Sequence, residues 1–182
     1  MRNTLKMIIV LTAVGLISGA TLVFTYKYAS PLIKNNKRKE IESAIFSIYP
    51  SAKNYDKKTV HEKMIFEVKD GSGKLLGYAF LAKGNGYQGT IKLMAGISTD
   101  FKTVKGIEIL ESQETPGLGQ EIASDKFRSQ FKGLKTEPEI TYIKNKKPEK
   151  RNEIQAVTGA TISSRAVVSI LNETIDKLKP KK

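Results

Sequence analysis

"MIFEVKDGSGKLLGYAFLA", residues 64–82, contains two strand-like runs separated by a turn. The runs at 64–69 and 75–82 are rich in aliphatic and aromatic residues, which favour strands. The intervening "DGSGK" at 70–74 combines an aspartate with two glycines, a composition typical of tight turns. Two strands joined by so short a connection predict an antiparallel hairpin.

The segments that follow the hairpin extend the same pattern. The glycine-rich "GNGYQG" at 84–89 is a second short connection. Further strands are expected at 90–97, 104–110 and 139–143, a short helix at 124–131, and a solvated loop at 144–153. Met64 and Met94 are expected in the core. Consecutive strands with short turns favour a twisted, mostly antiparallel sheet.

A helix is expected on each side of the strands in the sequence. Residues 34–49 form a basic amphipathic pattern that Pro50 ends, with Ile41, Ile45, Ile48 and Tyr49 at helical spacing. A final helix follows residue 160, and its predicted apolar stripe comprises Ile162, Ala166, Val167, Ile170, Leu171, Ile175 and Leu178. The predicted fold class is therefore α+β, a twisted mostly antiparallel sheet flanked by helices.

The N-terminal segment 7–26 contains twenty consecutive uncharged residues. A helix of that length spans about 30 Å, which is the thickness of a bilayer's hydrocarbon core. We expect one transmembrane helix, with Pro31 ending either this helix or its juxtamembrane turn, which gives a membrane anchor at 1–30 and a soluble domain at 31–182. A cleaved signal peptide is the rival interpretation.

Positive residues lie on both sides of this segment. Arg2 and Lys6 precede it, and a larger group follows it, namely Lys27, Lys34, Lys37, Arg38 and Lys39. The positive-inside rule therefore leaves the orientation open.

Composition narrows the function classes. The 182 residues carry a net charge of +13, which fits an anionic membrane surface, an acidic partner or nucleic acid. The basic residues are scattered without interleaved aromatics, so no nucleic-acid partner is expected. The absence of cysteine excludes disulfides, thiol catalysis and cysteine-ligated metal sites. The single histidine, His61, is expected on the surface.

The sequence "TGAT" at 158–161 precedes the final helix and allows two interpretations. In one, Thr158 caps the helix and Gly159-Ala160 only provides a tight turn into it. In the other, the segment binds a phosphate, because the first turn of a helix offers unpaired N–H groups and the positive end of its dipole. Gly159 and Ala160 would let the backbone approach the anion, and the first helical turn adds the hydroxyls of Thr161, Ser163 and Ser164.

Three motifs resemble one known family. "TGATISSRAV" at 158–167 resembles the flavin-attachment motif of extracytoplasmic FMN-binding domains, "ETPGLG" at 114–119 resembles a second signature, and "GYQGTI" at 86–91 a third. Such domains occur in the G subunit of the Rnf electron transport complex and in the C subunit of the sodium-translocating NADH:quinone reductase. The order and separation of the motifs also match, and the resemblance covers nearly the whole chain.

The resemblance implies FMN joined covalently to Thr161 by a phosphoester, with Thr158, Gly159, Ala160 and Ser163 around the phosphate. It implies a single-pass protein of the cell membrane whose soluble domain is extracytoplasmic and carries electrons as a subunit of an Rnf-type ferredoxin:NAD oxidoreductase. Its partners would be the lipid bilayer, other membrane subunits and, for maturation, a flavin transferase. Two alternatives stay open: the C subunit of the quinone reductase, and a non-redox tethered module that binds anionic cell-wall polymer.

The other two motifs supply candidate contacts to the flavin ring. Leu118 is an apolar tip that would cover a flavin face, Thr115 and backbone N–H groups would meet the polar edge, and Gly119 allows the turn dihedrals. Glu114 is expected to order the loop as a hydrogen-bond acceptor, and Tyr87 either stacks on the ring or packs. One departure from the family is Gln155, which stands where an aspartate commonly precedes the modified threonine by six residues; it keeps an acceptor oxygen but loses the charge.

Overall fold

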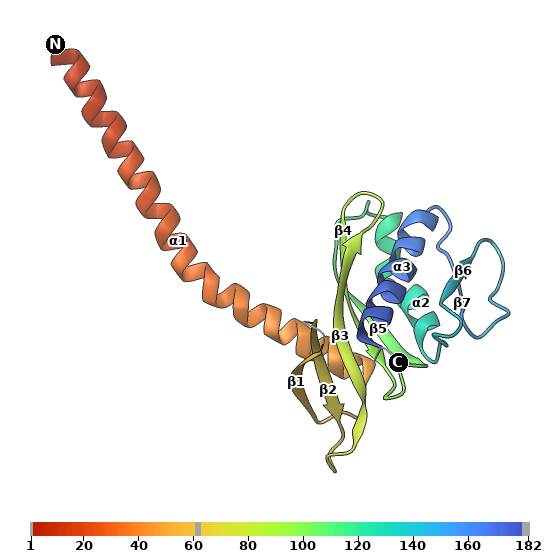
Figure 1. Cartoon of the computed structure of the whole chain (residues 1–182). Helices are drawn as coiled ribbons and strands as arrows, with labels where there is room; N and C mark the ends of the chain where they lie inside the picture. Colours follow the sequence, from red (N-terminus) through yellow and green to blue (C-terminus); the bar gives the residue numbers. More distant parts are fainter. Residues whose placement is uncertain (1, 61–62, 180–182) are drawn as a thin grey trace. The chain divides into compact units, whose positions relative to one another are not determined.

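The computed structural model describes residues 2–60 and 63–179, so His61 lies outside the described residues. The chain comprises two compact units, Met1–Glu40 and Ile41–Lys182. Figure 1 shows one long N-terminal helix followed by strands and shorter helices. The predicted boundary between anchor and domain after residue 30 stays a prediction.

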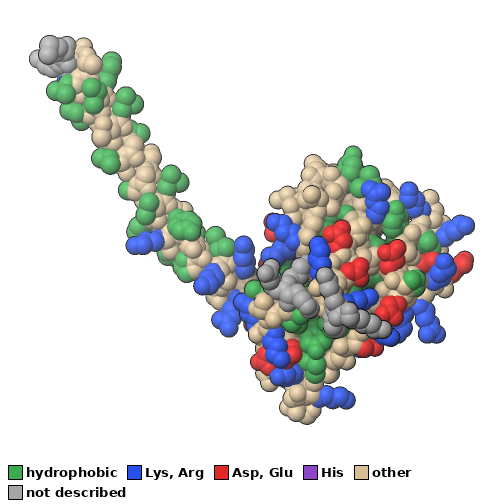
Figure 2. Space-filling view, in the orientation of Figure 1, with side chains coloured by type: hydrophobic (Ala, Val, Ile, Leu, Met, Phe, Trp, Pro, Cys, Tyr) green, Lys and Arg blue, Asp and Glu red, His purple; other side chains and the backbone are tan. Residues whose placement is uncertain are grey.

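Helix α1 (Arg2–Ile48) is continuous, which makes the expected end at Pro31 wrong. A proline removes one hydrogen bond to the preceding turn, and the helical segments on both sides of Pro31 are long enough to persist without it. The helix is long and apolar enough to cross a membrane, and Figure 2 shows hydrophobic side chains along its first part, followed by Lys and Arg side chains. The structure thus provides one candidate span in the described residues.

The main sheet has five strands in the order β1-β2-β3-β4-β5, and every neighbouring pair is antiparallel. Its strands are β1 (Asn54–Val60), β2 (Lys63–Lys69), β3 (Leu75–Asn85), β4 (Thr90–Ile97) and β5 (Val104–Ser112). The last four confirm the predicted strands, whereas β1 lies in a segment for which no strand is predicted. The predicted α+β fold class is confirmed.

The sheet is covered on both faces. Alternate residues of β4 point to opposite sides, so that Leu93 joins the core under helix α3 (Thr161–Leu178), whereas Met94 joins the core under the last turns of α1. Ile45 and Tyr49 confirm the predicted apolar stripe of 34–49, since both are buried. The core position expected for Met64 is wrong, because this residue is 40% exposed.

Short elements connect β5 to α3. They are η1 (Gly119–Ala123), α2 (Asp125–Arg128), η2 (Ser129–Phe131), β6 (Thr141–Ile143) and β7 (Glu153–Gln155). The helix predicted at 124–131 is present as α2 and η2, with Phe127 and Phe131 buried. The strand predicted at 139–143 is β6, which pairs in parallel with β7 in a separate two-stranded sheet. This small sheet leads the chain to the start of α3.

Candidate functional site

The "TGAT" segment forms a turn that ends at the first residue of α3. The Ala160 N–H donates to the Val157 carbonyl at 3.0 Å, and Gly159 adopts a φ of +81°, which suits the third position of a type II turn. Ala160, and not Thr158, is the residue that precedes the helix, and it makes no side-chain capping bond. The interpretation of Thr158 as a helix cap is therefore wrong.

Ser164 holds this turn from inside the helix. Its buried hydroxyl donates to the Ala160 carbonyl at 2.9 Å and accepts from the Val157 N–H at 3.0 Å. The turn is thus closed by a helical residue and not by an acceptor at the helix entrance. In the described part of the chain, the first-turn amides of α3 consequently have no side-chain cap and can meet an anion.

Glu114 links the loop before β4 to the start of α3. Its Oε1 accepts from the N–H groups of Tyr87 at 2.8 Å and Gln88 at 3.1 Å, and its Oε2 accepts from the Ser163 hydroxyl at 2.6 Å. Burial acts to raise the pKa of the Glu114 carboxyl, but the hydrogen bonds from Ser163 and the loop backbone lower it below its ordinary value. Glu114 is therefore a charged acceptor that orders the loop, as the sequence predicts.

The "ETPGLG" segment is a compact turn beside Glu114. The N–H groups of Leu118 and Gln120 both donate to the Thr115 carbonyl, and the Thr115 hydroxyl donates to the Gln88 side chain. Gly117 has a φ of +72°, a conformation that favours glycine. This geometry leaves Leu118 half exposed at the tip of the turn.

These segments surround one cavity of about 390 Å³, called here the entrance pocket. It is lined by Tyr87, Glu114, Thr115, Leu118, Gly119, Gly159, Ala160, Thr161, Ile162 and Ser163. Every predicted site residue except Thr158 lies in this lining, although the three segments are far apart in the sequence. A volume of roughly 300–1,000 Å³ is usual for cofactor sites.

Ile162 lines the pocket although its spacing along the helix predicts a core position. It was expected in the apolar stripe of α3, but it is 45% exposed and lines the entrance pocket. Its position directly after Thr161, on the first turn of the helix, is the signal that identifies it. Tyr87 and Leu118 are also exposed at this pocket, so three large apolar side chains are available to contact a ligand.

Thr158 and Gln155 lie beside a different cavity. This hollow of about 250 Å³ also contacts Phe127 and Gln130. The Gln130 side chain accepts from the Gln155 N–H at 2.7 Å and donates to the Gln155 carbonyl at 3.2 Å. The segment before the "TGAT" turn is thereby fixed to η2, and the Thr158 position is separate from the entrance pocket.

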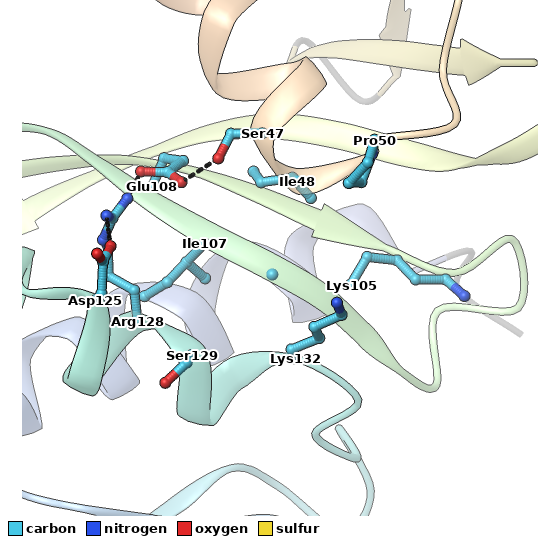
Figure 3. Close-up of a pocket in the computed structure, with 11 residues that line it drawn as sticks. Ser47, Ile48, Pro50, Lys105, Ile107, Glu108, Asp125, Arg128, Ser129 and Lys132 are labelled. Atoms are coloured by element: carbon cyan, nitrogen blue, oxygen red, sulfur yellow. Dashed lines mark hydrogen bonds and ion pairs between the residues drawn. The ribbon is translucent and has the colours of Figure 1, made fainter.

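Another hollow, of about 320 Å³, is lined by residues from the end of α1, β5 and α2 (Figure 3). Arg128 forms ion pairs with Glu108 and Asp125, and the Ser47 hydroxyl donates to Glu108 at 2.6 Å. These contacts connect three elements of the domain, and none of the predicted site residues lines the hollow. The entrance pocket is accordingly the better candidate for a cofactor.

Comparisons with known proteins agree with this geometry. The profile of the FMN-binding domain matches residues 86–176, which include all three motifs. The G subunit of the ion-translocating oxidoreductase complex of Methanosarcina acetivorans is 31% identical over 179 residues, covering 94% of this chain and 92% of that protein. The G subunit of the proton-translocating ferredoxin:NAD(+) oxidoreductase complex of Clostridium ljungdahlii is 32% identical over 168 residues, covering 92% and 88%.

A solved structure shares the fold. The crystal structure of Shewanella oneidensis NqrC aligns with a TM-score of 0.59 at 25% identity, covering 70% of this chain and 67% of that one. The motifs, the pocket that unites them and these matches together lead to one conclusion. The chain belongs to the FMN-binding domain family.

Proposed function

We propose that this chain is a membrane-anchored electron carrier, the G-type subunit of an Rnf-type ion-translocating ferredoxin:NAD oxidoreductase complex, with FMN esterified to Thr161. The observation that carries the proposal is the entrance pocket, where Thr161 begins an uncapped helix beside the 114–119 turn. The two relatives that match most of this chain are named as the G subunits of such complexes.

The start of α3 suits the phosphate end of the cofactor. Thr161 is partly exposed, and its hydroxyl makes no hydrogen bond within the described residues, so it is available for esterification. Attachment forms an Oγ–P bond, releases the Oγ proton and breaks the phosphoanhydride bond of an activated FMN donor such as a flavin dinucleotide, whose nucleotide leaves. The remaining phosphodiester charge gains about 0.3–1 kcal/mol from the helix dipole where it is solvent-exposed.

The rest of the pocket suits the flavin ring. Tyr87, Leu118 and Ile162 offer apolar surface, while Thr115 and Glu114 border it with polar groups. FMN, when bound, supplies reversible electron transfer, taking electrons from a reduced centre of the complex and giving them to an oxidised one. The chain binds and orients the ring; we assign it no acid–base residue for a substrate.

The proposed location is the outer face of the cell membrane, with α1 as the single span. Because charge alone predicts neither orientation, this proposal rests on the family resemblance. The absence of cysteine allows a direct test, since Ser72→Cys in the exposed 70–74 turn introduces a single thiol. A membrane-impermeant maleimide should label this variant in intact cells. Labelling only after lysis would show that the soluble domain faces the cytoplasm, opposite to the proposal.

Mass spectrometry tests the cofactor proposal. The full-length chain, co-expressed with a flavin transferase, should gain the mass of one FMN group, and Thr161→Ala should abolish the gain. Thr59→Ala is the control, because it removes an exposed threonine hydroxyl on β1, outside the motifs and the entrance pocket, and should stay flavinylated. If the wild-type chain stays unmodified and binds anionic cell-wall polymer, the non-redox module is favoured. If the neighbouring genes encode a quinone reductase, the C subunit of that complex is favoured.

A further inference from the structure

Glu114 occupies an unusual electrostatic position. Among residues 3–60 and 64–179, whose side-chain burial the structure describes, it is the only acidic or basic side chain that is buried, with 5% of its surface exposed. A buried carboxylate usually has a cationic partner, because transfer from water costs several kcal/mol per ion. For Glu114 the described part of the chain contains no such ion pair, and its hydrogen bonds come from neutral donors only.

The surrounding backbone fixes the position of this carboxylate. A Cβ atom added at Gly86 would lie 2.2 Å from Oε1, and one added at Gly119 would lie 2.6 Å from Oε2. Neither distance is sterically possible, so both oxygens are enclosed by glycines that let the backbone approach. Together with the Ser163 hydrogen bond, this packing connects the 86–89 loop and the start of α3 through the Glu114 carboxylate.

The carboxylate remains charged at neutral pH. Its hydrogen bonds lower the pKa of Glu114 despite burial, so the group is ionised well below pH 7. Glu114 also lines the entrance pocket, where the proposed flavin ring would lie. A negative charge whose position is fixed by hydrogen bonds therefore borders the proposed ring site.

We propose that Glu114 is a positioning residue that holds the wall of the entrance pocket in place and, through its uncompensated negative charge, lowers the reduction potential of the flavin. This inference rests on the proposed function. Reduction adds electrons to the ring, and a neighbouring anion opposes each addition. The protein thereby makes its flavin a stronger reductant without any residue taking part in the electron transfer.

The potential is tested with full-length, flavin-loaded protein. Glu114→Gln keeps the shape and an acceptor oxygen for the Tyr87 and Gln88 amides, but removes the charge. Its midpoint potential, measured by spectroelectrochemical titration, should shift to a more positive value. Glu111→Gln is the matched control, because it removes the same charge from an exposed position on β5 and should leave the potential close to that of the wild type.

Positioning is tested in the same chain without flavin. Glu114→Ala removes the acceptor for the Tyr87 and Gln88 amides, so hydrogen exchange at both should accelerate, whereas Glu114→Gln should retain protection. Unchanged exchange in Glu114→Ala would overturn the positioning role, and a zero or negative shift in Glu114→Gln would overturn the effect on the potential. A wild-type chain that never acquires flavin would instead overturn the proposed function, and the potential effect with it.

Discussion

The Tyr49 hydroxyl lies 2.9 Å from the carbonyl oxygen of Ile97, the last residue of β4. It also lies 2.9 Å from the carbonyl of Tyr78 on β3, so that one buried hydroxyl donates to both strands in a shared hydrogen bond. Tyr49 directly follows α1, and a Cβ at Gly77 would lie 2.7 Å from its hydroxyl oxygen. The end of α1 is thus fastened to the sheet on the face opposite α3.

Replacing Tyr49 by Phe should destabilise the domain. The substitution keeps the packed ring but leaves the Ile97 carbonyl without its side-chain partner, and the free energy of unfolding should fall by about 1–2 kcal/mol. Urea unfolding of the full-length chain in detergent, followed by far-ultraviolet circular dichroism, measures the change. Tyr55→Phe is the control, because Tyr55 packs between Phe46 and Phe66 through its ring. Equal losses in both variants would contradict the assigned role of the hydroxyl.

The same hydroxyl should make stability depend on alkaline pH. Burial raises the pKa of Tyr49 well above its ordinary value, whereas in the unfolded chain it titrates near about pH 10. Above that pH the unfolded state loses the proton and the folded state keeps it, so the stability contributed by Tyr49 falls as pH rises. The stability difference between wild type and Tyr49→Phe should therefore narrow from about pH 9 to about pH 11. A constant difference across this range would show that Tyr49 ionises equally in both states.

Ser164→Ala should loosen the turn that presents Thr161. The partly buried Val157 N–H loses its acceptor, which should lower the free energy of unfolding by about 0.5–1.5 kcal/mol and reduce the extent of flavin attachment. Thr174→Val is the control on the same helix, since the Thr174 hydroxyl donates only to the Ile170 carbonyl one turn earlier. Denaturation and intact mass report the two effects. Full flavin attachment in Ser164→Ala would argue against a role for this turn in maturation.

Gly119→Ala should disrupt the wall of the entrance pocket. The new Cβ would lie 2.6 Å from Glu114 Oε2 and 2.8 Å from the Ser163 hydroxyl, so the surrounding groups must move. Overpacking of this kind costs about 1–3 kcal/mol of unfolding free energy. Gly71→Ala, whose Cβ would meet Lys53 at an ordinary 3.5 Å, should change stability by less than about 0.5 kcal/mol. Similar unfolding midpoints for the two variants would show that Glu114 and Ser163 can move to accommodate the added methyl group with little loss of stability.

Most of the main sheet is predictable from the sequence because β2–β5 are apolar runs separated by short connections, two of which are rich in glycine. Strand β1 is not, since its residues are mostly exposed and its position depends on pairing with β2. Strand β7 has three residues, and each pairs in parallel with a β6 residue twelve positions earlier in the sequence. Such short, pairing-dependent strands have no local signature. Pro31 has a strong local signature, but the helix end that it predicts is absent, because a long helix tolerates the loss of one hydrogen bond.

The residues of the entrance pocket are likewise predictable from the sequence, but their orientation is not. Motif types and spacing predicted nine of the ten pocket-lining residues, with Ile162 the exception. They did not predict the direction in which each residue faces. The positive φ of Gly159 and the Ser164 bonds set the course of the turn, and Thr158 consequently lines a separate hollow. These are relationships between residues several positions apart, which residue types in a motif do not specify.

Strand β1 is an edge strand of the main sheet. Lys57 and Lys58 stand exposed in the middle of this strand. Lysines on an edge strand disfavour the approach of a second strand that would otherwise hydrogen-bond to its unpaired backbone groups. Where many copies are concentrated together, these lysines therefore disfavour hydrogen bonding between the β1 strands of neighbouring domains.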